Sequence, residues 1–131
     1  MVIADKSSLP VSIVVASASP HEVTLAQETL AFRFTRAAPV YLVGDRAYDS
    51  DSLDKELKPL TIMIAPHRSN RVRKKTQDGR QLRRMKRRWK VERLNAWLQS
   101  FRSITTRFAY YFENYRALVL LGCMLILLRY Y

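Results

Sequence analysis

The chain has 131 residues and a mass of 15.3 kDa, which suits one domain or part of one. Apolar residues make up 48% of it, which allows a packed core and argues against extensive disorder. Its 23 basic and 11 acidic residues give a net charge of +12. The single cysteine, Cys123, excludes a disulfide framework and a four-cysteine zinc site, and it suits the reducing cytoplasm, where we expect the protein to be located.

The first half of the chain predicts strands and helices in alternation. Residues 2–4 and the β-branched run 11–16 are predicted to form a hairpin, because turn-forming residues separate them. A helix is expected from a cap at Ser19 to about Phe34. The continuous apolar run 40–43 is typical of a central strand buried on both faces.

The alternation continues to Pro66. Ser50 or Asp51 can cap a helix over residues 52–57, and the apolar run 61–64 predicts another strand. Strands that alternate with helices indicate an α/β fold.

The second half of the chain predicts a loop and two helices. Residues 68–79 have no apolar period and are expected to form a basic loop. Residues 80–103 fit one long helix, because four apolar residues recur on one face: Val91, Leu94, Leu98 and Phe101. A helix over 112–129 is apolar nearly all round and is expected to be mostly buried. Its apolar run is twelve residues long, whereas a bilayer span needs about 20, so no membrane partner is expected.

The positive charge is concentrated in residues 68–93. This window holds thirteen basic residues against Asp78 and Glu92, a net charge of +11, and the rest of the chain carries +1. Like charges this dense destabilise a fold unless a polyanion screens them, so nucleic acid is the expected partner. The candidate DNA-binding residues are Arg71, Arg73, Lys74, Lys75, Arg83, Arg84, Lys86, Arg87, Lys90 and Arg93.

Two carboxylates stand out as candidates for chemistry. Asp45 follows Gly44 at the end of a predicted strand, where ligands of α/β sheets gather, although the position by itself favours a turn or cap role. Glu92 is surrounded by basic residues, with Arg88 one helical turn before it. Glu92 either forms an ion pair with Arg88 or binds a divalent metal that Arg88 helps to orient. Two carboxylates that bind Mg²⁺ or Mn²⁺ would suit phosphoryl transfer, whereas His21 and His67 lack spaced partners and are expected to be structural or exposed.

The order of several segments resembles the DDE transposases of bacterial insertion sequences, of the IS-four and IS-five type. The segments are Leu42-Val-Gly-Asp-Arg-Ala-Tyr-Asp-Ser50, Arg87-Arg-Trp-Lys-Val-Glu-Arg93, Phe101-Arg-Ser-Ile-Thr-Thr-Arg107, and Pro10-Val-Ser-Ile-Val followed by Pro20-His-Glu-Val-Thr. The resemblance covers nearly the whole chain. It implies an RNase H-like mixed sheet flanked by helices, with the sheet and helices in residues 1–66, the basic loop in 67–79, and a helical part with the glutamate in 80–131.

The resemblance also implies an activity. Asp45 would be the second acid of the catalytic triad and Glu92 the third, both binding Mg²⁺ or Mn²⁺ for DNA cleavage and joining. Arg88 matches the arginine of the family signature, whereas Met85 and Gln99 replace its tyrosine and lysine, which contact DNA phosphate.

The family's first catalytic aspartate lies on a strand before residues 2–5, so the resemblance implies that the domain is truncated there. Asp5 matches a hairpin turn and is a secondary candidate for that acid. We expect the chain to be inactive alone, to expose a sheet edge at 2–5 or 11–16, and to need an upstream transposase polypeptide that supplies the strand. A dimer on DNA is expected. The alternative function is a non-catalytic DNA-binding module or relic that uses residues 68–93.

Overall fold

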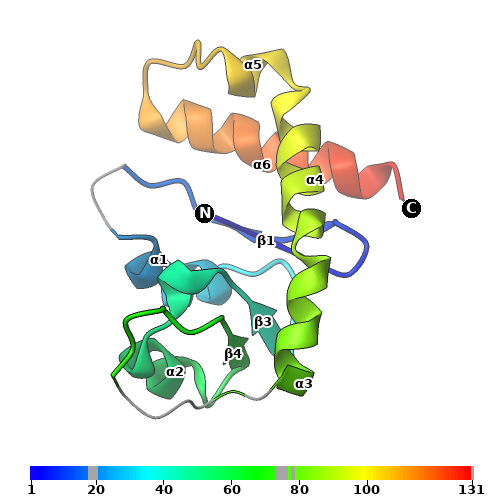
Figure 1. Cartoon of the computed structure of the whole chain (residues 1–131). Coiled ribbons are helices and arrows are strands. Elements are labelled where there is room, and N and C mark those ends of the chain that lie inside the picture. Colours follow the sequence, from blue (N-terminus) through cyan, green and yellow to red (C-terminus); the bar gives the residue numbers. More distant parts are fainter. Residues whose placement is uncertain (18–20, 73–76, 78, 131) are drawn as a thin grey trace.

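A short β-hairpin lies at the centre of the fold in the computed structural model, which describes residues 1–17, 21–72, 77 and 79–130 (Figure 1). Strands β1 (Val2–Ala4) and β2 (Pro10–Ile13) pair antiparallel. The Asp5 Oδ1 atom accepts hydrogen bonds from the backbone N–H groups of Ser7 and Leu9, at 2.7 and 2.8 Å, and so closes the turn. The predicted hairpin is therefore confirmed, and Asp5 lies in its turn.

The two faces of the hairpin contact different groups of helices. Ile3 packs into one core with α1 (Glu22–Ala31) and α2 (Asp51–Leu57). Its neighbours Val2 and Ala4 pack against a second core between α4 (Trp89–Gln99) and α6 (Phe112–Leu128). Successive strand residues point to opposite faces, so this thin sheet separates the two cores, as Figure 1 shows.

A second sheet consists of the parallel strands β3 (Tyr41–Val43) and β4 (Ile62–Ile64), connected by α2. Helix α2 begins after Ser50, whose side chain accepts a hydrogen bond from the Leu53 N–H at 3.5 Å, as its capping pattern predicts. The prediction that the strand at 40–43 is buried on both faces is wrong. Val40 and Tyr41 are 68% and 40% exposed, because a two-stranded sheet leaves much of each strand uncovered.

The predicted single mixed sheet is also not observed. Among the described residues the four strands form two separate two-stranded sheets, one antiparallel and one parallel. Ile3 of β1 and Leu42 of β3 nevertheless belong to the same hydrophobic core. The molecule is thus a mixed α/β fold whose two small sheets share a core.

Helix α1 differs from its prediction at both ends. It begins after His21 and ends at Ala31, about one turn before Phe34, and Phe34 is 45% exposed. The predicted cap, Ser19, lies outside the described residues.

The expected long helix at 80–103 is interrupted. In place of one helix, the chain forms four shorter elements: α3 (Gly79–Leu82), the 3₁₀ helix η2 (Arg83–Arg87), α4, and α5 (Arg102–Thr105). The 3₁₀ helix η2 covers the most basic part of this stretch, with Arg83, Arg84, Lys86 and Arg87.

Helix α6 is buried on one side only. Val119, Cys123 and Ile126 lie in the core, and burial raises the pKa of the Cys123 thiol to about 11. The prediction of a mostly buried helix is wrong for the opposite side, where a stripe of apolar residues is exposed: Leu121, Met124, Leu125 and Leu128. In the part of the chain that the structure describes, no helix combines the length and the hydropathy needed to cross a bilayer.

Gly44, between β3 and Asp45, is required by close packing. A Cβ at this position would contact the Met63 side chain and lie 2.8 Å from the Tyr48 ring. We expect Gly44→Ala to lower the free energy of unfolding by about 2 kcal/mol, because an added methyl group overpacks the site. Gly79→Ala is the matched control, since its Cβ would have no neighbour within 4 Å among the described residues. Urea unfolding of both variants measures the difference, and equal stabilities would contradict the prediction.

Candidate metal and DNA site at the end of strand β3

The chain places Asp45 directly after β3 and Gly44. Asp45 is the N-cap of the short 3₁₀ helix η1 (Arg46–Tyr48), and its Oδ1 atom accepts a hydrogen bond from the Ala47 N–H at 2.8 Å. Its side chain is half-buried. One carboxylate oxygen is therefore held by the backbone, and the other has no hydrogen-bond partner among the described residues. The position combines both roles considered for it, a cap and a potential ligand.

Glu92 lies in the first turn of α4. The Arg88 guanidinium is 3.5 Å from Glu92 Oε1, and the two side chains are 41% and 55% exposed. An exposed pair one turn apart contributes only a few tenths of a kcal/mol, about 0.3. Glu92 is thus accessible to a ligand, and Arg88 lies beside it as the helical spacing predicts.

The elements that carry the two acids contact each other at one point. The Arg84 guanidinium of η2 stacks over the Tyr41 ring of β3, 4.0 Å from its centre. Asp45 follows Tyr41 by four residues, and Glu92 follows Arg84 by eight residues. The basic segment, residues 68–93, is therefore anchored to the strand that leads to Asp45.

Across the described ranges, no three His, Cys, Asp or Glu side chains gather closely enough to hold a metal ion by themselves. A metal at Asp45 and Glu92 would therefore need further ligands from water or from a bound substrate.

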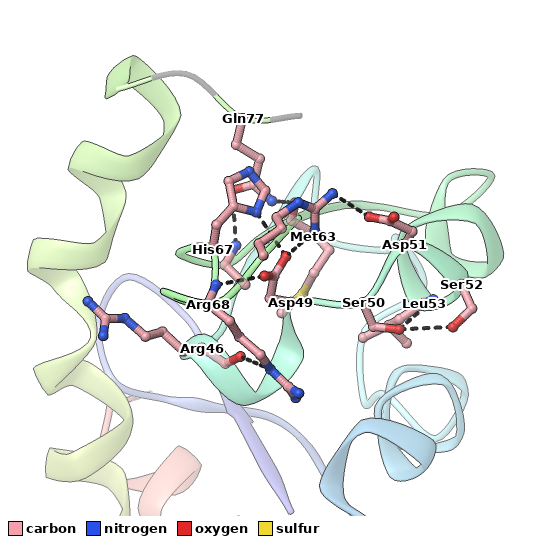
Figure 2. Close-up of polar contacts among 12 residues, drawn as sticks. Arg46, Asp49, Ser50, Asp51, Ser52, Leu53, Met63, His67, Arg68 and Gln77 are labelled. Atoms are coloured by element: carbon pink, nitrogen blue, oxygen red, sulfur yellow. Dashed lines mark hydrogen bonds and ion pairs between the residues drawn. The ribbon is translucent and has the colours of Figure 1, made fainter. Parts of the chain in front are cut away.

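The strongest polar network in the region centres on Asp49, which the sequence did not single out (Figure 2). Its side chain is only 6% exposed. It accepts hydrogen bonds from His67 Nδ1 at 2.9 Å, from the Arg68 N–H at 2.7 Å, and from the Arg71 guanidinium at 2.7 Å. Arg71 also binds Asp51 at 2.6 Å. This network joins the loop after Asp45 to the start of the basic segment.

The network changes the charge states of its members. Burial by itself raises the pKa of Asp49, but hydrogen bonds from the Arg68 N–H and His67, together with the charge of Arg71, outweigh it and hold the pKa below its ordinary range. The hydrogen bond with Asp51 raises the pKa of Arg71 further. Asp49 is therefore ionised at neutral pH and holds this corner of the fold together.

The candidate DNA-binding residues have different surroundings. Arg83, Lys86 and Arg87 are exposed on η2. Lys90 and Arg93 lie over the ring of Trp89, at 4.2 and 4.3 Å. Other candidates have structural contacts or are not described: Arg71 pairs with two aspartates, Arg84 stacks on Tyr41, and Arg73, Lys74 and Lys75 lie outside the described residues. A DNA contact by any of them stays a prediction.

Comparison with known families gives a match over almost the whole chain. The family model described as "Transposase DDE domain" matches residues 1–128. The chain belongs to the transposase DDE domain family. Among curated proteins and among solved structures, nothing matches this DDE domain. Membership connects the domain with DNA transposition and with nuclease-type chemistry.

The sequence could have drawn attention to Asp49 itself, but not to the residues that bind it. Asp49 follows Asp45 by four residues in the segment that carries the resemblance to transposases. His67 and Arg71, which bind it, lie 18 and 22 residues further along the chain. No local spacing connects them, so only the fold reveals the network. His67 has a structural contact, one of the two roles expected for it.

We expect Asp49→Asn to lower the melting temperature of the DDE domain by about 8 °C. The substitution removes the charge from the hydrogen bonds to His67 and Arg71, which costs about 2 kcal/mol. Folding lowers the pKa of Asp49, so its stabilising effect is present above about pH 4 and is lost as the pH falls through the lowered pKa of the native state. The difference between the parent and the variant should therefore disappear in acid.

Asp54→Asn provides the matched control for this experiment. Burial raises the pKa of Asp54, and the nearby charges of Asp51 and Asp49 add to the effect. The ionised form of Asp54 is therefore unfavourable in the fold, so its neutralisation should leave the melting temperature unchanged or raise it. Thermal melts followed by circular dichroism from pH 3 to 7 test both variants, and an equal loss in the two would contradict the role of Asp49.

Proposed function

We propose that this DDE domain binds DNA and contributes to metal-dependent phosphoryl transfer, the cleavage and joining of DNA strands, at the ends of a mobile element. Within the family we assign it to the IS-four and IS-five type of insertion sequence, with an RNase H-like arrangement of its strands. The assignment rests on the segments around Asp45 and Glu92 that resemble those transposases.

The contact between Arg84 and Tyr41 carries this proposal. It anchors the basic segment of the chain to the strand that precedes Asp45. A DNA strand attracted by the exposed arginines and lysines of η2 would therefore be guided towards Asp45 and Glu92, the two carboxylates proposed to bind the metal.

The donor atoms suit Mg²⁺ or Mn²⁺. Both ions prefer carboxylate oxygens, and Mg²⁺ is commonly held by one or two carboxylates together with substrate phosphates and water. Asp45 offers one unpartnered carboxylate oxygen and Glu92 an exposed carboxylate. When bound, the metal would supply an activated oxygen nucleophile and stabilise the leaving oxygen. The Ala47 N–H would keep the Asp45 carboxylate oriented, and Arg88 would do the same for Glu92.

A second candidate function is a non-catalytic DNA-binding module. It is favoured by the absence of a third acidic ligand near Asp45 and Glu92 within the described ranges, and by Met85 and Gln99, which depart from the family signature. This candidate requires the basic surface alone, so the two candidates differ in their response to metal.

We expect Mn²⁺ to bind at a site to which both Asp45 and Glu92 contribute. In NMR spectra of the DDE domain with duplex DNA, Mn²⁺ should broaden the backbone signals near both residues in the same titration. Asp45→Asn or Glu92→Gln should remove the broadening at both places, whereas Glu56→Gln, an exposed acid on α2, should retain it. In a complete transposase, either substitution should reduce strand transfer at least about 10³-fold, equivalent to about 4 kcal/mol.

Broadening near only one of the two residues would contradict a shared metal site. Unchanged spectra and unchanged DNA affinity in all variants would favour the non-catalytic module.

We also propose a partner polypeptide that adds a strand between the two sheets. In the part of the chain described here, β1 pairs only with β2 and β3 only with β4, yet β1 and β3 share one core. An inserted strand that carries an acidic residue would join the two sheets into one mixed sheet and bring a third carboxylate towards Asp45. A dimer on DNA stays a prediction.

We expect residues 1–131 alone to self-associate, because unpaired strand edges invite pairing with other chains. Light scattering after size-exclusion chromatography measures the association. Met124→Lys tests the rival cause, the exposed apolar side of α6, and should leave the association unchanged. A soluble, cooperatively melting monomer would contradict the proposal.

A further inference from the structure

An open hollow of about 470 Å³ lies against η1, the short 3₁₀ helix that Asp45 caps. It is lined by Arg46, Ala47, Arg68, Ser69 and Asn70. Two of these residues directly follow Asp45, and the other three come from the start of the basic segment. The Asp49 network is what brings these two stretches of chain together.

Arg68 is fixed in place without losing its charge. Its backbone N–H binds Asp49 Oδ2 at 2.7 Å. Its guanidinium donates to the carbonyl oxygens of Arg46 and Ala47, at 3.3 and 3.2 Å. Carbonyl groups orient a guanidinium but do not neutralise it, so the positive charge remains available at a defined position.

Arg46 contributes a second positive charge. Within the residues that the structure describes, its guanidinium has neither a hydrogen bond nor an ion pair, and Figure 2 shows its side chain extending away from Asp49. The closest acid of the network, Asp49, is already paired with Arg71 and His67. The two arginines of the hollow therefore have no carboxylate partner in the described part of the chain.

The other two polar side chains of the hollow can also donate hydrogen bonds to an anion. Ser69 and Asn70 are exposed, and each offers a neutral hydrogen-bond donor. Arginines with hydroxyl and amide donors are the usual ligands of DNA phosphate oxygens, and such contacts position DNA without reading its sequence.

We propose that this hollow binds a backbone phosphate of DNA beside Asp45, with Arg46 and Arg68 as its charged ligands. The inference rests on the proposed DNA-binding function and adds a subsite outside the predicted DNA-binding residues. Because Arg68 is attached to the carbonyls of η1, a phosphate held here has a fixed position relative to the Asp45 carboxylate. The subsite is therefore a positioning element for the strand that enters the site.

The test measures DNA affinity and its dependence on salt. Fluorescence anisotropy with a labelled 20-base-pair duplex of arbitrary sequence, in about 50 to 200 mM NaCl, gives the slope of log K against log salt. A chain that neutralises about six phosphates should show a slope near −5. Arg46→Gln should make the slope less negative by about 0.9 and weaken binding roughly three- to tenfold.

Arg36→Gln is the matched control. Arg36 is an exposed arginine in the loop after α1, and its guanidinium has no partner among the described residues. It should leave both the slope and the affinity nearly unchanged. Arg68→Gln should resemble Arg46→Gln, and circular dichroism shows whether it still folds without its two carbonyl contacts.

A second pair of variants removes any dependence on the folding of Arg68→Gln. Asn70→Asp places a negative charge in the hollow, whereas Asn114→Asp places the same charge on an exposed turn of α6. The first should weaken DNA binding more than the second, by roughly three- to tenfold. If Arg46→Gln behaves like Arg36→Gln, and Asn70→Asp like Asn114→Asp, the subsite is refuted while DNA binding by the domain stands. A flat salt response of the unaltered chain refutes both.

Discussion

The buried carboxylate of Asp49 is the constraint on which the candidate site depends. A negative charge removed from water must be matched by donors, and here the donors come from residues 67–71, far along the chain. This requirement holds the loop after β3 against the start of the basic segment. Asp45, the hollow lined by the residues that follow it, and the path of the basic segment therefore share one support.

The concentrated positive charge takes part in contacts within the fold and also underlies the expected DNA binding. Five of the six residues from 83 to 88 are arginine or lysine, and the 3₁₀ helix η2 covers most of this stretch. Some cations of the basic segment stack on aromatic rings: Arg84 lies over Tyr41, and Lys90 and Arg93 lie over Trp89. Such cation–π contacts stabilise the positive charges where they are. The charges that remain exposed on η2 are those that a polyanion would neutralise.

The sequence predicted the local elements better than their arrangement. The hairpin, the helix capped by Ser50 and the strands on either side of that helix follow from turn residues, capping and apolar runs, which act over a few positions. The burial of 40–43 and of α6 was predicted wrongly, since burial depends on how many elements pack on each face. Asp45 and Glu92 were singled out because each stands out locally, by a preceding glycine or by its basic neighbours, and their catalytic role stays a prediction. The Asp49 network joins residues about twenty positions apart and has no local pattern.

The enclosure of Cys123 has a practical consequence for the study of this domain. A thiol with a pKa of about 11, packed between α4 and α6, is almost entirely protonated at neutral pH, and the thiolate is the form that reacts with alkylating reagents. The native protein is therefore expected to react very slowly with maleimides. A cysteine introduced on the surface would then be the one thiol of the protein that reacts readily with such reagents. Spectroscopic or cleavage probes could be attached to it without first replacing Cys123.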